Sequence, residues 1–120
     1  MTDVEIIVAL AEKVMGWEVF GEPYPGPGQW AYSGTIGNQH LEGYIGGYHV
    51  PQWNPLESIA DAWIMVEELQ SRGIFLGLDA IDVRTWAANL TDRHASYRME
   101  GPSAQRAICL AALATIEVEA

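Results

Sequence analysis

Apolar residues recur every three or four positions at the start of the chain, which is the spacing of one helix face. The stripe consists of Val4, Ile7, Leu10 or Ala11, and Val14. Thr2 and Glu5 have the spacing of a capping box, in which each residue satisfies a free amide of the first turn. Gly16 suits the position just after a helix. The pattern predicts a helix over residues 3–15 that faces the core.

A second helical pattern follows Asn54, which is a good N-cap residue, and Pro55, which suits the first helical position. Arg72 and Gly73 are typical of a helix end. The predicted apolar stripe of this helix contains Leu56, Ile59, Trp63 and Val66, widened by Ala62 and Leu69.

Shorter apolar runs after Gly73 predict strands at residues 74–78 and 83–90, with a third at 94–100. Ser103 then caps a predicted last helix over residues 104–118. Residues 107–114 of this helix are apolar on nearly every side, so we expect it to be covered on two faces. A second subunit is the expected second cover, which predicts a homo-oligomer, a dimer or higher.

The segment at about residues 20–52 has a different composition, rich in Gly, Pro and aromatic residues. The prolines at 22–28 exclude regular structure there, and Gly37-Asn38 is a hairpin-type dipeptide. We interpret the segment as a long surface insertion with one or two short strands in a single domain of residues 1–120. The order of elements predicts an α+β fold with helices packed on a small antiparallel sheet.

Several blocks of sequence resemble the phage ABA sandwich domain family, which consists of small proteins of tailed phages and prophages. The blocks are Ala9–Trp17, Trp53-Asn54-Pro55, Ile59–Trp63 and Ala107–Leu113, in the family's order. The resemblance implies a helix–sheet–helix (α-β-α) sandwich and a phage origin, and it supplies no catalytic motif.

Sixteen acidic and six basic residues give a net charge of −10. This charge argues against a protein that binds duplex DNA or RNA, and against binding to an anionic membrane surface. Cys109 is the only cysteine, so no internal disulfide is expected and a reducing host cytoplasm is the predicted location. Acidic residues flank the apolar run at residues 6–10, so we expect neither a signal peptide nor a membrane span.

The residues best suited to hold a ligand are aromatic side chains of the insertion, the Trp53-Asn54 pair and arginines late in the chain. Aromatic rings stack on flat ligands, and guanidinium groups bind phosphate. The alternative interpretations are a half-buried strand for the aromatic residues, a helix cap for Asn54 and a solvated edge strand for the arginines. The candidate ligand-binding residues are Trp30, Tyr32, Tyr44, Tyr48, Trp53, Asn54, Arg84, Trp86 and Arg98.

No catalytic constellation is visible in the sequence. His40, His49 and His94 lack the spacing of metal ligands, and the glycine-rich stretches match no phosphate or dinucleotide loop. Cys109 lies in the apolar last helix and is expected to be an inert hydrophobe. Asp61 interrupts an apolar run, and Arg84 or Arg106 is its expected partner. We therefore expect no enzyme, no metal and no cofactor.

These features predict a small phage-encoded binding protein that sequesters a nucleotide immune signal, such as a cyclic dinucleotide or a cyclic ADP-ribose isomer, and so counters host defence. A first alternative is an acidic inhibitor of a host nucleic-acid-binding enzyme, since a negative surface attracts basic partners. A second is a small phosphodiesterase that depends on His40 or His49.

Overall fold

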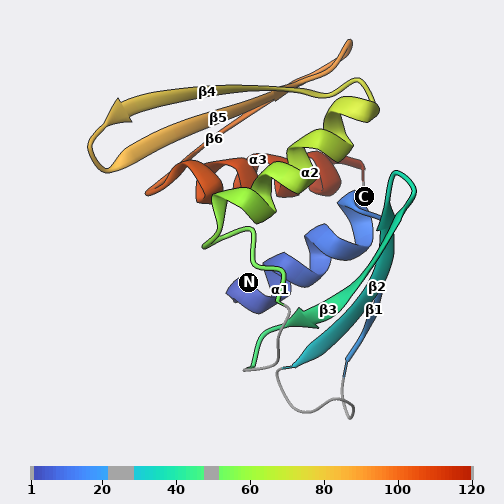
Figure 1. The fold of residues 1–120 in the computed structure, drawn as a ribbon. Coiled ribbons are helices and arrows are strands. Elements are labelled where there is room, and N and C mark those ends of the chain that lie inside the picture. The colour runs from blue at the N-terminus through green and yellow to red at the C-terminus, as the bar shows by residue number, and fades with distance from the viewer. Residues whose placement is uncertain (1, 22–28, 48–51, 120) are drawn as a thin grey trace. The chain divides into compact units, whose positions relative to one another are not determined.

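The computed structural model describes residues 2–21, 29–47 and 52–119. Their contacts cluster into two compact units, Met1–Asn54 and Pro55–Ala120, each of which contains helices and a three-stranded antiparallel sheet (Figure 1). The predicted α+β class is confirmed. The single domain predicted for residues 1–120 stays a prediction, because the compactness of each unit does not measure whether the two unfold together. Among the described residues, no helix is both long and apolar enough to cross a membrane.

The first unit begins with α1 (Asp3–Ala9), continues as the π-helix η1 (Leu10–Val14), and then forms β1 (Glu18–Phe20), β2 (Trp30–Ile36) and β3 (Gln39–Ile45). The strands pair in the order β1-β2-β3. β2 and β3 form a hairpin that turns at Gly37 with a φ of 58°, which confirms the turn predicted there.

The predicted first helix is correct in its extent but wrong in the type of its last turn. The Thr2 hydroxyl accepts a hydrogen bond from the Glu5 amide at 3.2 Å, as the capping pattern predicts. The Met15 amide donates to the Leu10 carbonyl, five residues back, at 3.0 Å. Gly16 then ends the helix with a φ of 72°.

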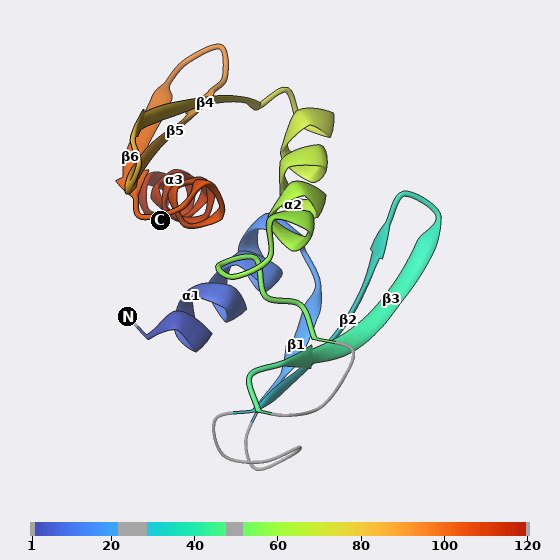
Figure 2. The same cartoon turned by 60° about the vertical axis from the view of Figure 1, so that its left-hand side comes forward.

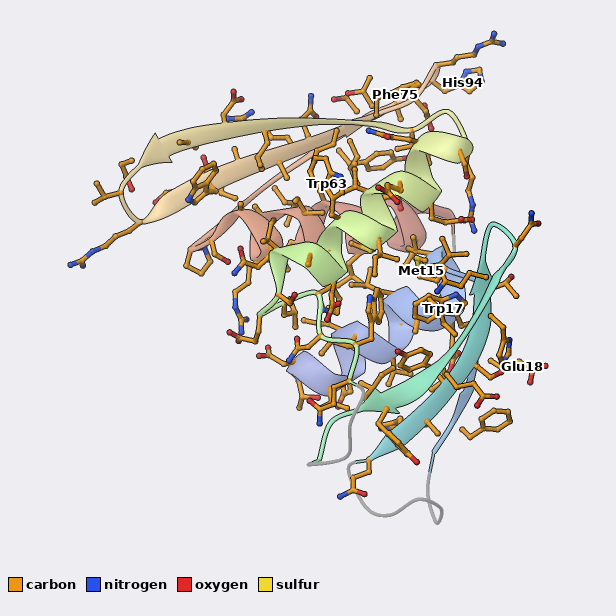
Figure 3. All side chains as sticks on the ribbon, viewed as in Figure 1. Met15, Trp17, Glu18, Trp63, Phe75 and His94 are labelled. Atoms are coloured by element: carbon orange, nitrogen blue, oxygen red, sulfur yellow. The ribbon has the colours of Figure 1, made fainter. Side chains whose placement is uncertain are left out.

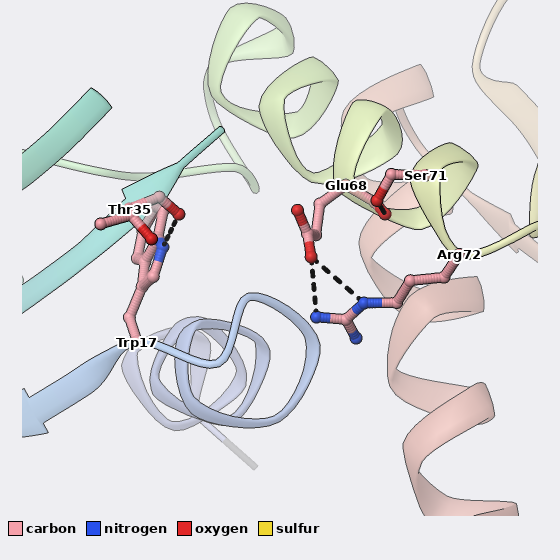
Figure 4. Close-up of polar contacts among 5 residues, drawn as sticks. All are labelled: Trp17, Thr35, Glu68, Ser71 and Arg72. Carbon is pink, nitrogen blue, oxygen red and sulfur yellow. Dashed lines mark hydrogen bonds and ion pairs between the residues drawn. The ribbon is translucent and has the colours of Figure 1, made fainter. Parts of the chain in front are cut away.

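Trp17 organises the core of the first unit. Its ring stacks on Tyr32 and meets Trp53 edge-on, both with centroids 4.9 Å apart. The indole Nε1 donates to the Thr35 carbonyl at 3.4 Å (Figure 4). A Cβ added at Gly34 would overlap the indole, so this glycine is what allows Trp17 to approach β2.

The second unit contains α2 (Ile59–Ser71), β4 (Phe75–Asp82), β5 (Thr85–Thr91), β6 (Ser96–Gly101) and α3 (Ala104–Glu119). The strands pair in the order β4-β5-β6. α3 packs against β5 and β6, whereas α2 packs against β4 and α3, on the same side of the sheet (Figure 2). The three predicted strands and the last helix are confirmed, with boundaries that move by a few residues.

The start predicted for the second helix was wrong. Ser58, not Asn54, is the N-cap: it has extended backbone angles, and its hydroxyl accepts from the Asp61 amide at 3.2 Å. Residues 55–57 form a separate turn, and the Glu57 carboxylate in this turn makes an ion pair with Arg106 of α3 at 2.6 Å.

The end predicted for the second helix is confirmed. Arg72 is the C-cap, and Gly73 follows with a φ of 81°. The guanidinium of Arg72 donates to the Glu68 carboxylate at 2.9 Å, and the Ser71 hydroxyl donates to the Glu68 carbonyl at 2.6 Å (Figure 4).

The apolar stripe predicted for this helix was wrong at two positions. Ile59 and Trp63 are 47% and 45% exposed, since they lie to one side of the buried face. The buried side chains of α2 are Ala62, Met65, Val66 and Leu69.

The last helix is capped as predicted, with the Ser103 hydroxyl accepting from the Arg106 amide at 3.2 Å. Its small residues allow close packing: a Cβ at Gly101 on β6 would lie 2.9 Å from the Ala107 nitrogen. Five side chains of α3 are fully buried within this single chain, namely Ala107, Ile108, Cys109, Ala111 and Ala112. A second subunit is thus not needed to cover these residues, and the homo-oligomer stays a prediction.

Replacing Ser58 by alanine should lower the free energy of unfolding by about 1 kcal/mol, because an amide of the first turn of α2 loses its acceptor. Ser58→Gly should cost only a few tenths of that amount, roughly 0.3 kcal/mol, because glycine leaves the end of the helix accessible to water. Urea unfolding followed by circular dichroism measures both. Equal stability of Ser58→Ala and the parent chain would contradict the assignment of the cap.

Candidate functional site

The aromatic residues of the first sheet divide between its two faces. Side chains alternate along a strand, and residues paired across antiparallel strands share a face. Tyr32, 8% exposed, and Trp53, 2% exposed, pack against Trp17, so both stabilise the core. Trp30 shares the face of Tyr32, and its ring covers Gly21.

The opposite face of this sheet carries, among the described residues, a row of two aromatic side chains with a small residue between them. Phe20 on β1 pairs with Ala31 on β2, and Ala31 pairs with Tyr44 on β3. Phe20 is 52% exposed and Tyr44 is half-buried. A hollow of about 440 Å³ lies here, lined by Phe20, Ala31, Tyr32, Ser33, Glu42, Gly43 and Tyr44. The structure therefore places a candidate binding site on this face.

A second row, beside the aromatic one, is acidic. Glu18 pairs with Ser33, and Ser33 pairs with Glu42. Glu18 lies on the side of the sheet away from α1, whereas its neighbour Trp17 lies on the side of α1 (Figure 3). The imidazole Nε2 of His40 lies 3.0 Å from the Glu42 carboxylate, and both side chains are more than half exposed.

The charge of the first unit favours cations. Residues 1–54 contain six acidic residues but only one lysine or arginine, Lys13. All five arginines belong to residues 55–120. A phosphate-bearing ligand in the hollow would have no guanidinium from its own unit to neutralise it.

The candidate residues of the second unit are not brought together. Gly101 lies against α3 and pairs with Trp86, so half-buried Trp86 faces the helices. Arg98 pairs with Asn89, one position off that face, and therefore points to the other side of the sheet. Arg84 lies in the β4–β5 turn, where its amide donates to Asp82 at 2.8 Å.

Arg98 belongs to a polar, solvent-facing surface on the second sheet. Its guanidinium lies 3.5 Å from the Asp79 carboxylate, and both side chains are exposed. The Ser96 hydroxyl donates to the Asn89 side chain at 2.6 Å. This surface is typical of the solvated face of an antiparallel sheet.

Two candidate residues of the first unit remain. Asn54 is half-buried, directly after Trp53, and Tyr48 lies outside the described residues.

Phe20, Glu18 and Glu42 are site residues that the sequence analysis did not select. The available signal was the matched pair of tripeptides Glu18-Val19-Phe20 and Glu42-Gly43-Tyr44, in each of which an acid precedes an aromatic residue by two positions. Residues two apart on a strand share a face. The signal becomes visible only once both tripeptides are known to be strands of one sheet.

Among the residues that the structure describes, no three His, Cys, Asp or Glu side chains are grouped so that they could hold a metal ion. His49 lies outside that part of the chain. Burial raises the pKa of the Cys109 thiol to about 12, while the charge of Arg106 acts in the opposite direction. At neutral pH this cysteine is protonated, which makes it a poor nucleophile.

The Cys109 thiol should not react with a disulfide reagent such as DTNB at pH 8 in the folded protein, because the thiolate is the reactive form and burial suppresses it. Denaturation in guanidinium chloride should release one thiol per chain within the same assay. Rapid stoichiometric reaction without denaturant would show that α3 opens readily.

The elements define an α+β protein with two small antiparallel sheets, one of which has a face with acidic and aromatic residues. Residues 8–113 match the model of the phage ABA sandwich domain, and the chain belongs to this family of phage proteins. The predicted resemblance is thus confirmed.

One similar solved structure is the 2.0 Å crystal structure of a phage protein from Bacillus cereus ATCC 14579. It is 19% identical, with a TM-score of 0.65, and the match covers 96% of this chain and 92% of that one. At this identity the likeness concerns the fold alone. No curated protein sequence matches the chain significantly.

Proposed function

We propose that this phage protein is a non-catalytic binding protein whose outer face of β1–β2–β3 binds a basic segment of a host protein, in particular one that binds nucleic acid. The observation that carries the proposal is the pair of parallel rows on this face. Phe20, which is exposed, and Tyr44, which is half-buried, supply ring surface, and Glu18 and Glu42 supply negative charge beside it. Aromatic residues are enriched at protein interfaces, and charge complementarity directs the choice of partner.

The charge of the partner follows from the composition of the unit. A surface with carboxylates, on a unit that has no arginine of its own, competes with nucleic acid for basic proteins, because it offers the same sign of charge as phosphate. The net charge of −10 acts in the same direction over longer distances. Inhibition of a basic host protein by occupation of its nucleic-acid site is the expected outcome.

Sequestration of a nucleotide signal, the function that the sequence features predict, is the alternative. Glu42 lines the hollow and would repel the phosphates of such a ligand. Arg98 and Trp86 point to opposite faces of their own sheet, so they do not form a joint stacking and phosphate site. For these reasons the protein partner is the better-supported proposal.

The test compares the parent chain with a Glu18→Gln/Glu42→Gln variant as bait in host lysate, with retained proteins identified by mass spectrometry. We expect nucleic-acid-binding proteins that heparin and high salt release, and that the variant retains poorly. A Glu5→Gln/Glu12→Gln variant, which removes the same charge from exposed positions of α1 and η1, should behave as the parent chain.

An equal loss of retained protein in both double variants would overturn the proposal, because retention would then depend on net charge and not on this face. A nucleotide released from the purified chain on heating, detected by its absorbance and mass, would instead support sequestration.

A further inference from the structure

We infer that the hollow between Phe20 and Tyr44 binds the guanidinium group of an arginine side chain presented by the basic partner. This inference rests on the proposed function and specifies its central contact. It follows from the spacing of the two strands that carry the rings, the small residue between them and the position of the nearest carboxylates.

The spacing suits a flat group. Phe20 and Tyr44 are separated by one strand, β2, so their Cα atoms lie about 10 Å apart. A planar group in contact with a ring on each side needs about 7 to 8 Å between the two ring planes. A Cα separation of about 10 Å therefore leaves room for one flat group between the two side chains.

The floor of the hollow leaves room for the guest. Ala31 contributes only a methyl group between the two aromatic side chains, and Tyr32 next to it directs its ring to the Trp17 core. A larger residue at position 31 would fill the space between the rings. The hollow is therefore a consequence of the row Phe20–Ala31–Tyr44.

The neighbouring row supplies the charge. Glu42 lines the hollow and shares a face with Tyr44, two residues along β3, while Glu18 has the same relation to Phe20 on β1. A guanidinium stacked between the rings can donate edge-on to one of these carboxylates. The Ser33 hydroxyl, between the two acids, is a further acceptor.

These features discriminate between the two basic side chains. Arginine is planar, stacks on aromatic faces and is more weakly hydrated, whereas the lysine ammonium is a compact and strongly hydrated point charge. Both side chains can form ion pairs with the carboxylates, but only the planar guanidinium of arginine can stack between the two rings. An arginine preference is therefore the signature of this site.

The experiment measures the affinity of capped hexa-arginine and hexa-lysine peptides for the full chain by calorimetry, with the binding face located by NMR amide shifts. The parent chain should bind hexa-arginine at least about fivefold more tightly than hexa-lysine. Tyr44→Ala should remove this preference by weakening the arginine peptide alone. Tyr44→Phe should keep the preference, because the ring is retained.

Matched variants separate stacking from charge. Glu42→Gln should weaken both peptides to a similar degree, whereas Glu12→Gln, the same change on an exposed position of η1, should leave both unchanged. Trp63→Ala removes a similarly exposed aromatic side chain from the second unit and should also leave the preference unchanged.

Equal affinity of the two peptides, lowered by Glu42→Gln but not by Tyr44→Ala, would overturn the arginine site and leave the basic-partner function standing. Peptide binding that neither Glu42→Gln nor Tyr44→Ala alters, with no shifts in β1–β3, would overturn both.

Discussion

Gly34→Ala should destabilise the protein by about 3 kcal/mol, because the new methyl group would occupy the position of the Trp17 indole. Trp17 cannot move away without breaking its stack on Tyr32 and its hydrogen bond to the Thr35 carbonyl. Urea unfolding measures the loss, and the near-ultraviolet circular dichroism of the folded variant should change because the Trp17–Tyr32 contact is disturbed.

Gly77→Ala is the matched control, since Gly77 also lies within a strand. A Cβ there would meet only the Asn89 carbonyl oxygen, at 3.9 Å, which is an ordinary contact. We expect a change within about 1 kcal/mol, in the stabilising direction if the lower flexibility of the unfolded chain dominates. Similar losses of stability in both variants would show that the close approach of Trp17 to β2 does not require glycine at position 34.

Ile108→Ala should lower the free energy of unfolding by about 2 to 5 kcal/mol, because it removes a fully buried side chain from α3. Three of the residues next to Ile108 on the helix are alanines, at positions 107, 111 and 112, and they cannot extend to fill the cavity, so the cost should be toward the upper end of that range. Calorimetry or urea unfolding gives the value.

Val83→Ala, in the β4–β5 turn, is the comparison for this second substitution. Val83 is 97% exposed, so its replacement should change stability by less than about 0.5 kcal/mol. A loss below about 1 kcal/mol for Ile108→Ala would contradict the placement of α3 in a packed core.

Local sequence signals were sufficient for most of the elements. Thr2 and Glu5, Ser103, and Gly37-Asn38 each act through bonds to residues close by in the sequence, and the structure confirms all three sites. Asn54 and Pro55 have the composition of a helix start, yet the helix begins at Ile59. Glu57, in the turn before the helix, makes an ion pair with Arg106, 49 residues further along the chain, and such a contact is not visible in a local pattern.

The candidate site was only partly predictable for the same reason. Tyr44 could be selected as an aromatic residue of the insertion, but which face it occupies depends on the register of β3 against β2. Tyr32 and Trp53 are aromatic candidates of the same kind, yet both pack in the core, where each contacts the ring of Trp17. Phe20 and Glu18 can be recognised as site residues only once the pairing of β1 with β2 and of β2 with β3 is known.

The protonated, enclosed thiol of Cys109 makes the native chain a convenient scaffold for spectroscopy. A cysteine placed at position 20 or 83, both exposed, would be the only thiol open to a maleimide dye or spin label, so no cysteine-free background is needed. Distances between such probes on the two units would report how they are arranged in solution, with the natural sequence otherwise intact.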